Sequence, residues 1–166
     1  MSKFSEEAKI LSNPILGAYL IWKITKGYSE HNSEGSSPNI FHLYLAMGVL
    51  LSPELSLEVN NYKKNIQSFV RSFDSKNNPD ALYSIQDIIF LKKEYILDCI
   101  TSAMAQGLII WEPEDGNIYH NTLKSTKGVS SVSKIYKDDG KKADILGKWF
   151  ANLSIEEITS YLKVVL

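Results

Sequence analysis

The sequence is poor in residues that crosslink a chain or read nucleic acid. Its 166 residues include one cysteine, Cys99, and one arginine, Arg71. A disulfide needs two sulfur atoms, so none can form within the chain, and we expect folding in a reducing cytoplasm. Bidentate recognition of guanine is mostly the work of arginine. Any DNA contact would therefore be to the phosphate backbone rather than to base sequence.

Long apolar runs are also missing. The run at 43–51 is too short for a bilayer, whose core needs about 20 apolar residues. The opening MSKFSEEAK lacks the apolar centre of a signal peptide. We therefore expect neither secretion nor membrane insertion. With 44% hydrophobic and 22% charged residues, the chain should fold as a single globular domain, 1–166.

Motifs that carry catalysis are scarce. Gly140-Lys141-Lys142 lacks the rest of a GxxxxGK[ST] phosphate loop, and Cys99 lies among apolar neighbours, where a buried inert thiol is expected. The three histidines lie far apart and form no metal-ligand pair at helical or hairpin spacing: His31, His42 and His120. We expect a protein that is not an enzyme and that needs no cofactor or metal.

Charge is distributed unevenly along the chain. The net charge is −1, yet residues 124–148, here called the basic strip, hold seven lysines against three aspartates. Such a strip can contact DNA phosphates or an acidic partner surface. The candidate contact residues are Lys134, Lys137, Lys141 and Lys142. The alternative is a solvated basic linker over about 123–140, because Gly and Ser accompany the lysines.

The segment 13–28 predicts a central helix. Asn13 can cap a first turn and Pro14 suits the first helical position. Apolar residues then cover every direction of the helical wheel, which is typical of a helix buried on all sides. Gly27, just before Tyr28, is expected to end it.

Further helices are predicted at 40–51, where a strand is the alternative, and at 53–59 and 65–73. After a short helix at 81–85 and a break at 84–87, a longer helix should run from 88 to 106, capped by Asp87 and ended by Gly107. Its expected buried side comprises Leu91, Tyr95, Cys99, Ile100, Ala103 and Met104. Strands at 108–111 and 118–121 flank Asp115-Gly116, a strong hairpin signal.

This order of helices and hairpin predicts a winged-helix-like section at about 78–122. The expected hairpin tip carries Glu112, Glu114 and Asp115, which phosphate would repel. The winged-helix shape is thus better suited to binding protein than to reading DNA.

The C-terminal stretch 141–166 predicts two helices. The first contains Trp149 and Phe150, and the second follows Ser154 in a capping-box sequence. We expect the opening helix to pack against the Trp149–Phe150 helix, so that both ends of the chain close one core. Trp22, Tyr28, Trp149 and Phe150 are candidates for this core or for partner binding.

Two separated motifs resemble a known family. They are Asn13-Pro14, Ala18, Leu20-Ile21-Trp22 and Gly27-Tyr28 at the start, and Lys142-Ala143, Leu146-Gly147 and Trp149-Phe150-Ala151 near the end. In these residues the chain resembles the middle component of three-component ABC ATPase defence systems, the Lamassu type among them. The middle, 29–139, matches only in length and helical character. The chain departs from the family at two places. Lys148 stands where an arginine is expected, which puts a bidentate salt bridge there in doubt. The segment after Leu51 lacks the family's basic character, which puts DNA contact there in doubt.

The resemblance implies a small non-catalytic subunit that sits with an SMC-like ATPase and an effector, often a nuclease, in bacterial immunity against phage or plasmids. The expected fold is mainly α with one small β-hairpin, a compact helical domain. The alternative function is a stand-alone winged-helix DNA-binding transcriptional regulator.

Overall fold

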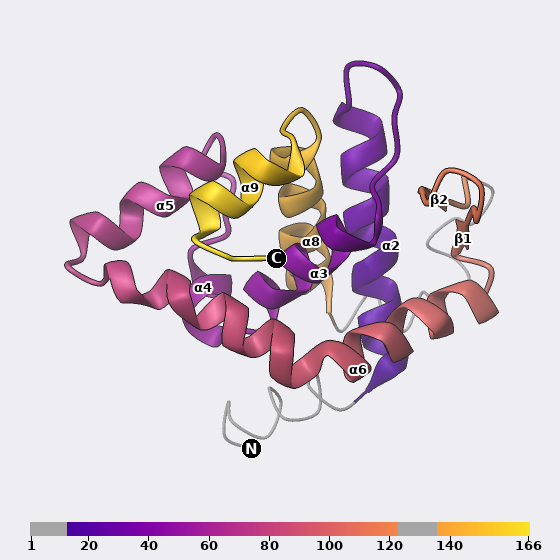
Figure 1. Ribbon diagram of the computed structural model, residues 1–166, viewed down its shortest axis with the longest axis horizontal. Coiled ribbons are helices and arrows are strands. Elements are labelled where there is room, and N and C mark those ends of the chain that lie inside the picture. Colours follow the sequence, from indigo (N-terminus) through magenta and orange to yellow (C-terminus); the bar gives the residue numbers. More distant parts are fainter. Residues whose placement is uncertain (1–12, 123–135) are drawn as a thin grey trace.

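Helices account for most of the fold, and one β-hairpin lies at its edge (Figure 1). The computed structural model describes residues 13–122 and 136–166. The elements are α2 (Pro14–His31), α3 (Ile40–Leu50), α4 (Pro53–Leu57), α5 (Ile66–Ser75), the 3-10 helix η1 (Pro79–Tyr83), α6 (Ser84–Ala105), β1 (Ile109–Trp111), β2 (Ile118–His120), α8 (Lys137–Phe150) and α9 (Ile155–Leu162). The predicted fold class, mainly α with one small hairpin, is confirmed.

Helix α2 begins where the sequence predicts. The Asn13 side chain accepts a hydrogen bond from the Ile15 amide at 3.0 Å, and Pro14 occupies the first turn. Buried residues surround the helix, as expected for a central element. The expected end at Gly27 is wrong, because α2 continues to His31. A β-carbon on Gly27 would stand 2.4 Å from the Asp144 carbonyl oxygen, so this glycine permits a close approach of α8.

Segment 40–51 forms a helix, α3, rather than a strand. Asn39 caps it, and His42 completes a capping box by accepting a hydrogen bond from the Asn39 amide. Ser52 then caps α4, which begins at Pro53. Helix α5 starts after its cap Asn65 and buries one apolar face, Ile66, Phe69 and Phe73.

Helix α6 differs from its prediction in three ways. The expected break at 84–87 is absent from this described stretch, because η1 leads directly into a helix that begins at Ser84. Asp87 therefore lies in the first turn and is not the cap. Leu91 and Met104, expected to be buried, are exposed. The local apolar periodicity could not reveal which directions the neighbouring helices α2 and α3 would cover.

The predicted end of α6 is confirmed. Gly107 has φ +68°, and the amides of Gly107 and Leu108 bond to the carbonyls of Met104 and Ala103 at 3.0 and 2.9 Å. These are the two bonds of a Schellman motif, which glycine favours because it tolerates a positive φ.

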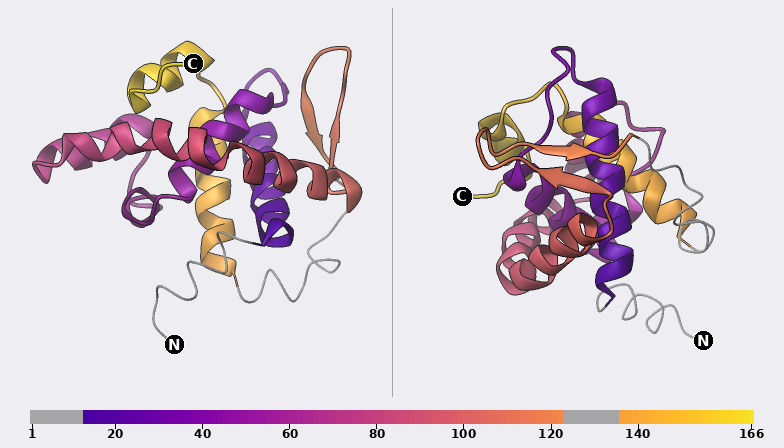
Figure 2. Two further views of the ribbon diagram at one scale, coloured as in Figure 1. Left: turned by 60° about the horizontal axis from the view of Figure 1, so that its bottom comes forward. Right: turned by 90° about the vertical axis from the view of Figure 1, so that its right-hand side faces the viewer.

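The hairpin forms at the expected place. β1 and β2 pair antiparallel, with Ile110 opposite Tyr119, and Gly116 in the connection has φ +71°. The Ile118 amide also bonds to the Pro38 carbonyl at 2.8 Å, which fixes the hairpin beside α2 (Figure 2, right). Residues 78–122 thus form one long helix and a hairpin, and η1 does not turn away from α6. The winged-helix interpretation is not confirmed.

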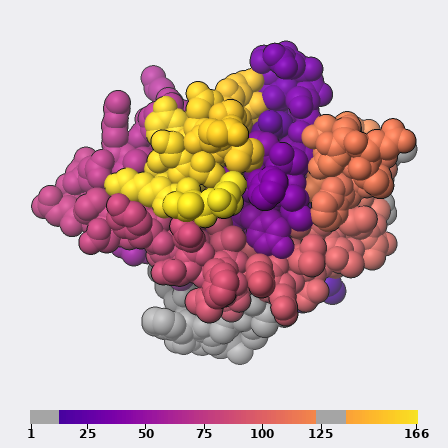
Figure 3. Space-filling view, viewed as in Figure 1, coloured from indigo at the N-terminus to yellow at the C-terminus, as the bar shows by residue number. Residues whose placement is uncertain are grey.

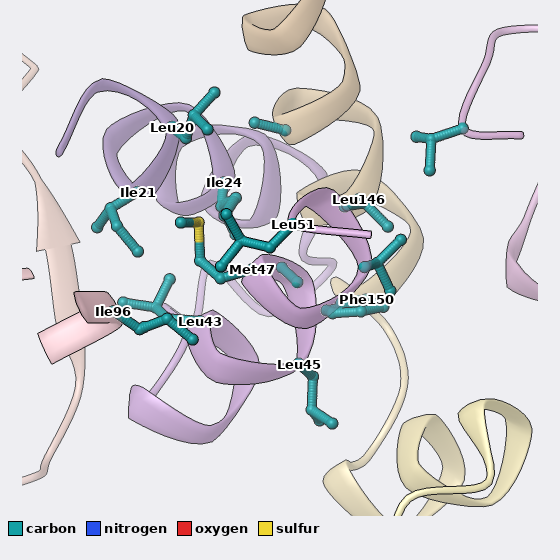
Figure 4. Close-up of a cluster of buried hydrophobic side chains, with 14 of the residues drawn as sticks. Leu20, Ile21, Ile24, Leu43, Leu45, Met47, Leu51, Ile96, Leu146 and Phe150 are labelled. Carbon is teal, nitrogen blue, oxygen red and sulfur yellow. The ribbon is translucent and has the colours of Figure 1, made fainter. Parts of the chain in front are cut away.

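The two ends of the chain meet in the core. The contact between α2 and α8 is the most extensive between any two described elements, which confirms that the opening helix packs against the Trp149–Phe150 helix. Their side chains join those of α3 and α6 in one cluster (Figure 4). Helix α8 begins at Lys137, so the end of the expected linker 123–140 is helical. Residues 123–135 lie outside the described residues.

Candidate functional site

The four aromatic candidates all lie in the core. Trp22, Tyr28, Trp149 and Phe150 are between 0 and 6% exposed. They contact different neighbours: Tyr28 meets the His42 ring of α3 edge-on at 4.9 Å between centroids, and Trp149 packs against Phe69 of α5 at 5.6 Å. The structure therefore does not gather them into one accessible patch. Their burial favours the core interpretation over partner binding.

The glycines of the two motifs have a clearer joint role. Gly27 lies against the backbone of Asp144, and Gly147 lies against the backbone of Ile24 and Tyr28. Each glycine therefore faces the other helix where α2 and α8 cross. A side chain at either position would force the two backbones apart, since packed interiors leave no spare volume.

Two asparagines link the same helices at one end. The Asn32 side-chain amide donates to the Ala151 carbonyl, and the Asn152 side-chain amide donates to the His31 carbonyl at 2.9 Å. The Asn152 side-chain oxygen accepts from the Ser33 amide at 2.9 Å. The sequence did not identify either asparagine as a link between the two helices. Its only signal is that each asparagine comes shortly after the end of a helix.

The lysine candidates do not form one site. Lys137 and Lys141 are exposed on consecutive turns of α8. The Lys142 ammonium lies 3.4 Å from the Ser56 hydroxyl of α4, so this side chain is turned elsewhere. Lys134 lies outside the described residues. Because α8 carries four lysines and three aspartates, the described part of the basic strip is nearly neutral.

The acidic groups on α8 and at the hairpin tip differ in how readily they lose their negative charge. Asp139 is half-buried on α8, and burial raises the pKa of its carboxyl group despite the opposing charge of Lys142. At the hairpin, Asp115 accepts hydrogen bonds from the Asn117 amide and the Tyr119 hydroxyl, each at 2.8 Å, which lower its pKa. The hairpin tip is thus a fixed anionic surface.

Two interior side chains that could act as a nucleophile or a base, Cys99 and His42, have roles in packing and in helix capping. Cys99 is fully buried against Gly17, and burial raises the pKa of its thiol to about 11. Burial lowers the pKa of His42 to about 4, while its Nδ1 accepts the Asn39 amide at 3.1 Å. Within residues 13–122 and 136–166, no three His, Cys, Asp or Glu side chains are placed to hold a metal ion.

None of the described helices combines the length and apolar character needed to cross a membrane.

Comparisons with curated proteins and with solved structures gave no match. A family model does match, over residues 1–166, and its description is ABC-three component (ABC-3C) system Middle Component 3. Since this match spans every residue that packs the α2–α8 core, the chain belongs to the family of middle components of ABC-three component systems.

Proposed function

We propose that this protein is a non-catalytic middle subunit of a cytoplasmic bacterial defence complex directed against phage or plasmids. In this complex it bridges an SMC-like ABC ATPase, of the kind found in Lamassu-type systems, and an effector such as a nuclease. The observation that carries the proposal is the family match over residues 1–166, because a middle component is by definition one part of a larger assembly.

The interior supports a structural rather than a chemical role. A nucleophilic cysteine needs a lowered pKa and access to substrate, whereas Cys99 is buried and its pKa is raised. His42 is held neutral by burial and completes the capping box of α3. Both residues therefore have packing roles that explain their positions.

The surface supports protein contact ahead of DNA contact. The hairpin tip presents Glu114 and Asp115 to solvent, and phosphate would be repelled there. This feature weakens the alternative of a stand-alone winged-helix DNA-binding regulator. Lys137 and Lys141 are exposed on the chain by itself, so each can contact phosphate or an acidic partner surface.

The test is to co-express the chain with the ATPase and effector encoded beside it, and to purify through a tag on the ATPase. We expect all three proteins to elute together and the effector to be lost when the middle gene is deleted. Phage plating should show that protection needs all three genes. Effector recovery that is independent of the chain would refute bridging.

The non-catalytic part of the proposal is tested with the chain alone. Purified protein should hydrolyse neither ATP nor DNA in the presence of divalent metals. Hydrolysis that disappears in a His42→Gln or Cys99→Ala variant that remains folded would show that the chain is itself an enzyme.

A further inference from the structure

Helix α6 carries large apolar side chains on the side that faces away from the core. Tyr83, at its N-cap, and Phe90, Leu97 and Met104 are between 42 and 70% exposed, and they follow one another at seven-residue intervals. We call these four residues the α6 ridge. The opposite side of the helix buries Ile96, Cys99, Ile100 and Ala103 in the core. Helix α6 is thus apolar on two sides, although the core needs only one.

The spacing of the ridge has a geometric meaning. Seven residues make nearly two helical turns, so the four side chains form an almost straight line about 30 Å long. Single exposed apolar residues are common on protein surfaces, but an aligned series of this length is characteristic of an interaction surface. An apolar residue at every seventh position supplies one of the two apolar positions of the heptad repeat by which helices pack side by side.

Charges flank the ridge unequally. Asp87, Glu94 and Asp98 are all exposed and follow one side of the line, given about 100° of rotation per residue. On the other side the nearest charge is Lys93, whose ammonium lies 5.5 Å from the centre of the Phe90 ring. A helix that packs on the ridge would therefore meet three carboxylates along one edge and would be stabilised by lysine or arginine there.

The described elements leave Phe90, Leu97 and Met104 exposed, whereas the Lys163 ammonium lies 5.5 Å from the centre of the Tyr83 ring. Helix α6 runs across the front of the molecule, with α2, α3 and α8 behind it (Figure 2, left), and it forms part of the surface seen in Figure 3. A second copy fits poorly. A two-fold axis that pairs two α6 helices antiparallel brings each acidic flank against the same flank of the other copy, which costs repulsion. Parallel pairing would offer the three carboxylates only Lys93 and, at the Tyr83 end, Lys163.

We propose that the α6 ridge binds an amphipathic α-helix of a partner subunit, which lies alongside α6 with heptad-spaced apolar residues on the ridge. Basic side chains of that helix face Asp87, Glu94 and Asp98. The inference rests on the proposed function in one respect: the helix belongs to another subunit of the same three-component system.

The test uses the full-length chain co-expressed with the other two subunits. A ridge variant, Phe90→Glu with Leu97→Glu, is compared with a control that places the same charges on two other exposed apolar residues, Leu57→Glu with Ile110→Glu. Because all four side chains are exposed, both variants should melt like the wild type. We expect the ridge variant to bind its partner at least about tenfold more weakly, as loss of interface anchors does, and the control to bind normally.

A second variant tests the charges without touching the apolar line. Asp87→Lys with Glu94→Lys and Asp98→Lys should also weaken binding, and the loss should shrink at high salt. A benzophenone amino acid placed at the exposed position 101, between Leu97 and Met104, should crosslink to a helical peptide rich in lysine or arginine.

The outcomes separate the two proposals. If the wild-type chain does not co-purify with either subunit, the proposed function fails, and this inference fails with it. If the wild type co-purifies and both α6 variants bind equally well, only this inference is overturned. Crosslinking to a second copy of the chain, or to a segment that is not helical, would also overturn it.

Discussion

Gly147 of α8 lies so close to Ile24 of α2 that a β-carbon on Gly147 would stand 2.2 Å from the Ile24 carbonyl oxygen. A carbon and an oxygen that are not bonded to each other cannot approach so closely. The crossing of α2 and α8 therefore depends on the absence of a side chain at Gly147. Because α2 and α8 come from opposite ends of the sequence, this contact closes the fold.

The Gly147→Ala substitution should destabilise the protein by about 1–2 kcal/mol, the overpacking cost less the gain in helix propensity. Alanine favours a helix by about 1 kcal/mol over glycine, but overpacking against a rigid backbone costs about 1–3 kcal/mol and sometimes more. The net effect should appear as a lower denaturant midpoint with an unchanged m-value.

Gly48→Ala provides the matched control within α3. Its β-carbon would meet side-chain atoms of Ile89 at 2.8 Å and of the buried Ile85 at 3.0 Å, rather than backbone atoms. Ile89 is only partly buried and can change rotamer. The cost should therefore be smaller than at Gly147. Equal losses at the two positions would show that the α2–α8 crossing is not specially tight.

Trp22→Ala should cost about 3–5 kcal/mol, a large share of a typical domain's stability, and should give poorly soluble protein. Trp22 is only 2% exposed, and within the described part of the chain nothing accepts a hydrogen bond from its indole N–H. Trp22→Phe should cost less, because it removes that buried donor and keeps most of the apolar volume.

Thermal melting of the Trp22→Ala and Trp22→Phe variants would measure both losses of stability. Tyr62→Ala, which changes an almost fully exposed aromatic residue, serves as the control. A soluble Trp22→Ala protein with normal melting but no partner binding would place Trp22 at an interface.

His42→Gln should remove a specific pH dependence of stability. The pKa of His42 is lowered by burial from 6.5 to about 4, so the unfolded chain binds a proton between these pH values and the folded chain does not. The stabilising contribution is complete above pH 6.5 and is lost as the pH falls to about 4, by about 3 kcal/mol in total. Denaturant unfolding from pH 8 to pH 4 would show a steeper loss in the wild type.

Glutamine is a suitable replacement for His42 because it can also complete a capping box at this position, so helix α3 should keep its start. Identical pH profiles of wild type and variant would mean that His42 does not carry this dependence.

Lys137→Glu with Lys141→Glu should reduce DNA retention by the assembled complex if the basic strip contacts phosphate. The loss should be greatest at low salt, because phosphate contacts weaken steeply as salt rises. Lys64→Glu with Arg71→Glu changes the charge equally at exposed positions near and on α5 and serves as control. Complex assembly and DNA retention should be measured separately over a salt series. If neither changes, even with Lys134 and Lys142 also replaced, the strip acts as a solvated linker.

Local chemistry in the sequence determined where most elements start and stop. Asn13 with Pro14, Gly107 and the Ser154–Glu157 capping box each satisfy backbone groups within a few residues, so their effect could be predicted without knowing the fold. The Asp115-Gly116 turn specified the hairpin in the same way.

Only the tertiary structure decided which faces are covered and which helices touch. Gly27 was expected to end a helix, and it instead admits α8, a contact made by a residue more than 100 positions away. Met104 also shows what local sequence cannot predict. Its position in the apolar pattern of α6 suited a buried face, but α2 and α3 cover the other side of α6 and leave the ridge exposed. The physical reason is that caps and turns form between neighbours in the chain, whereas burial depends on surfaces that meet only after folding.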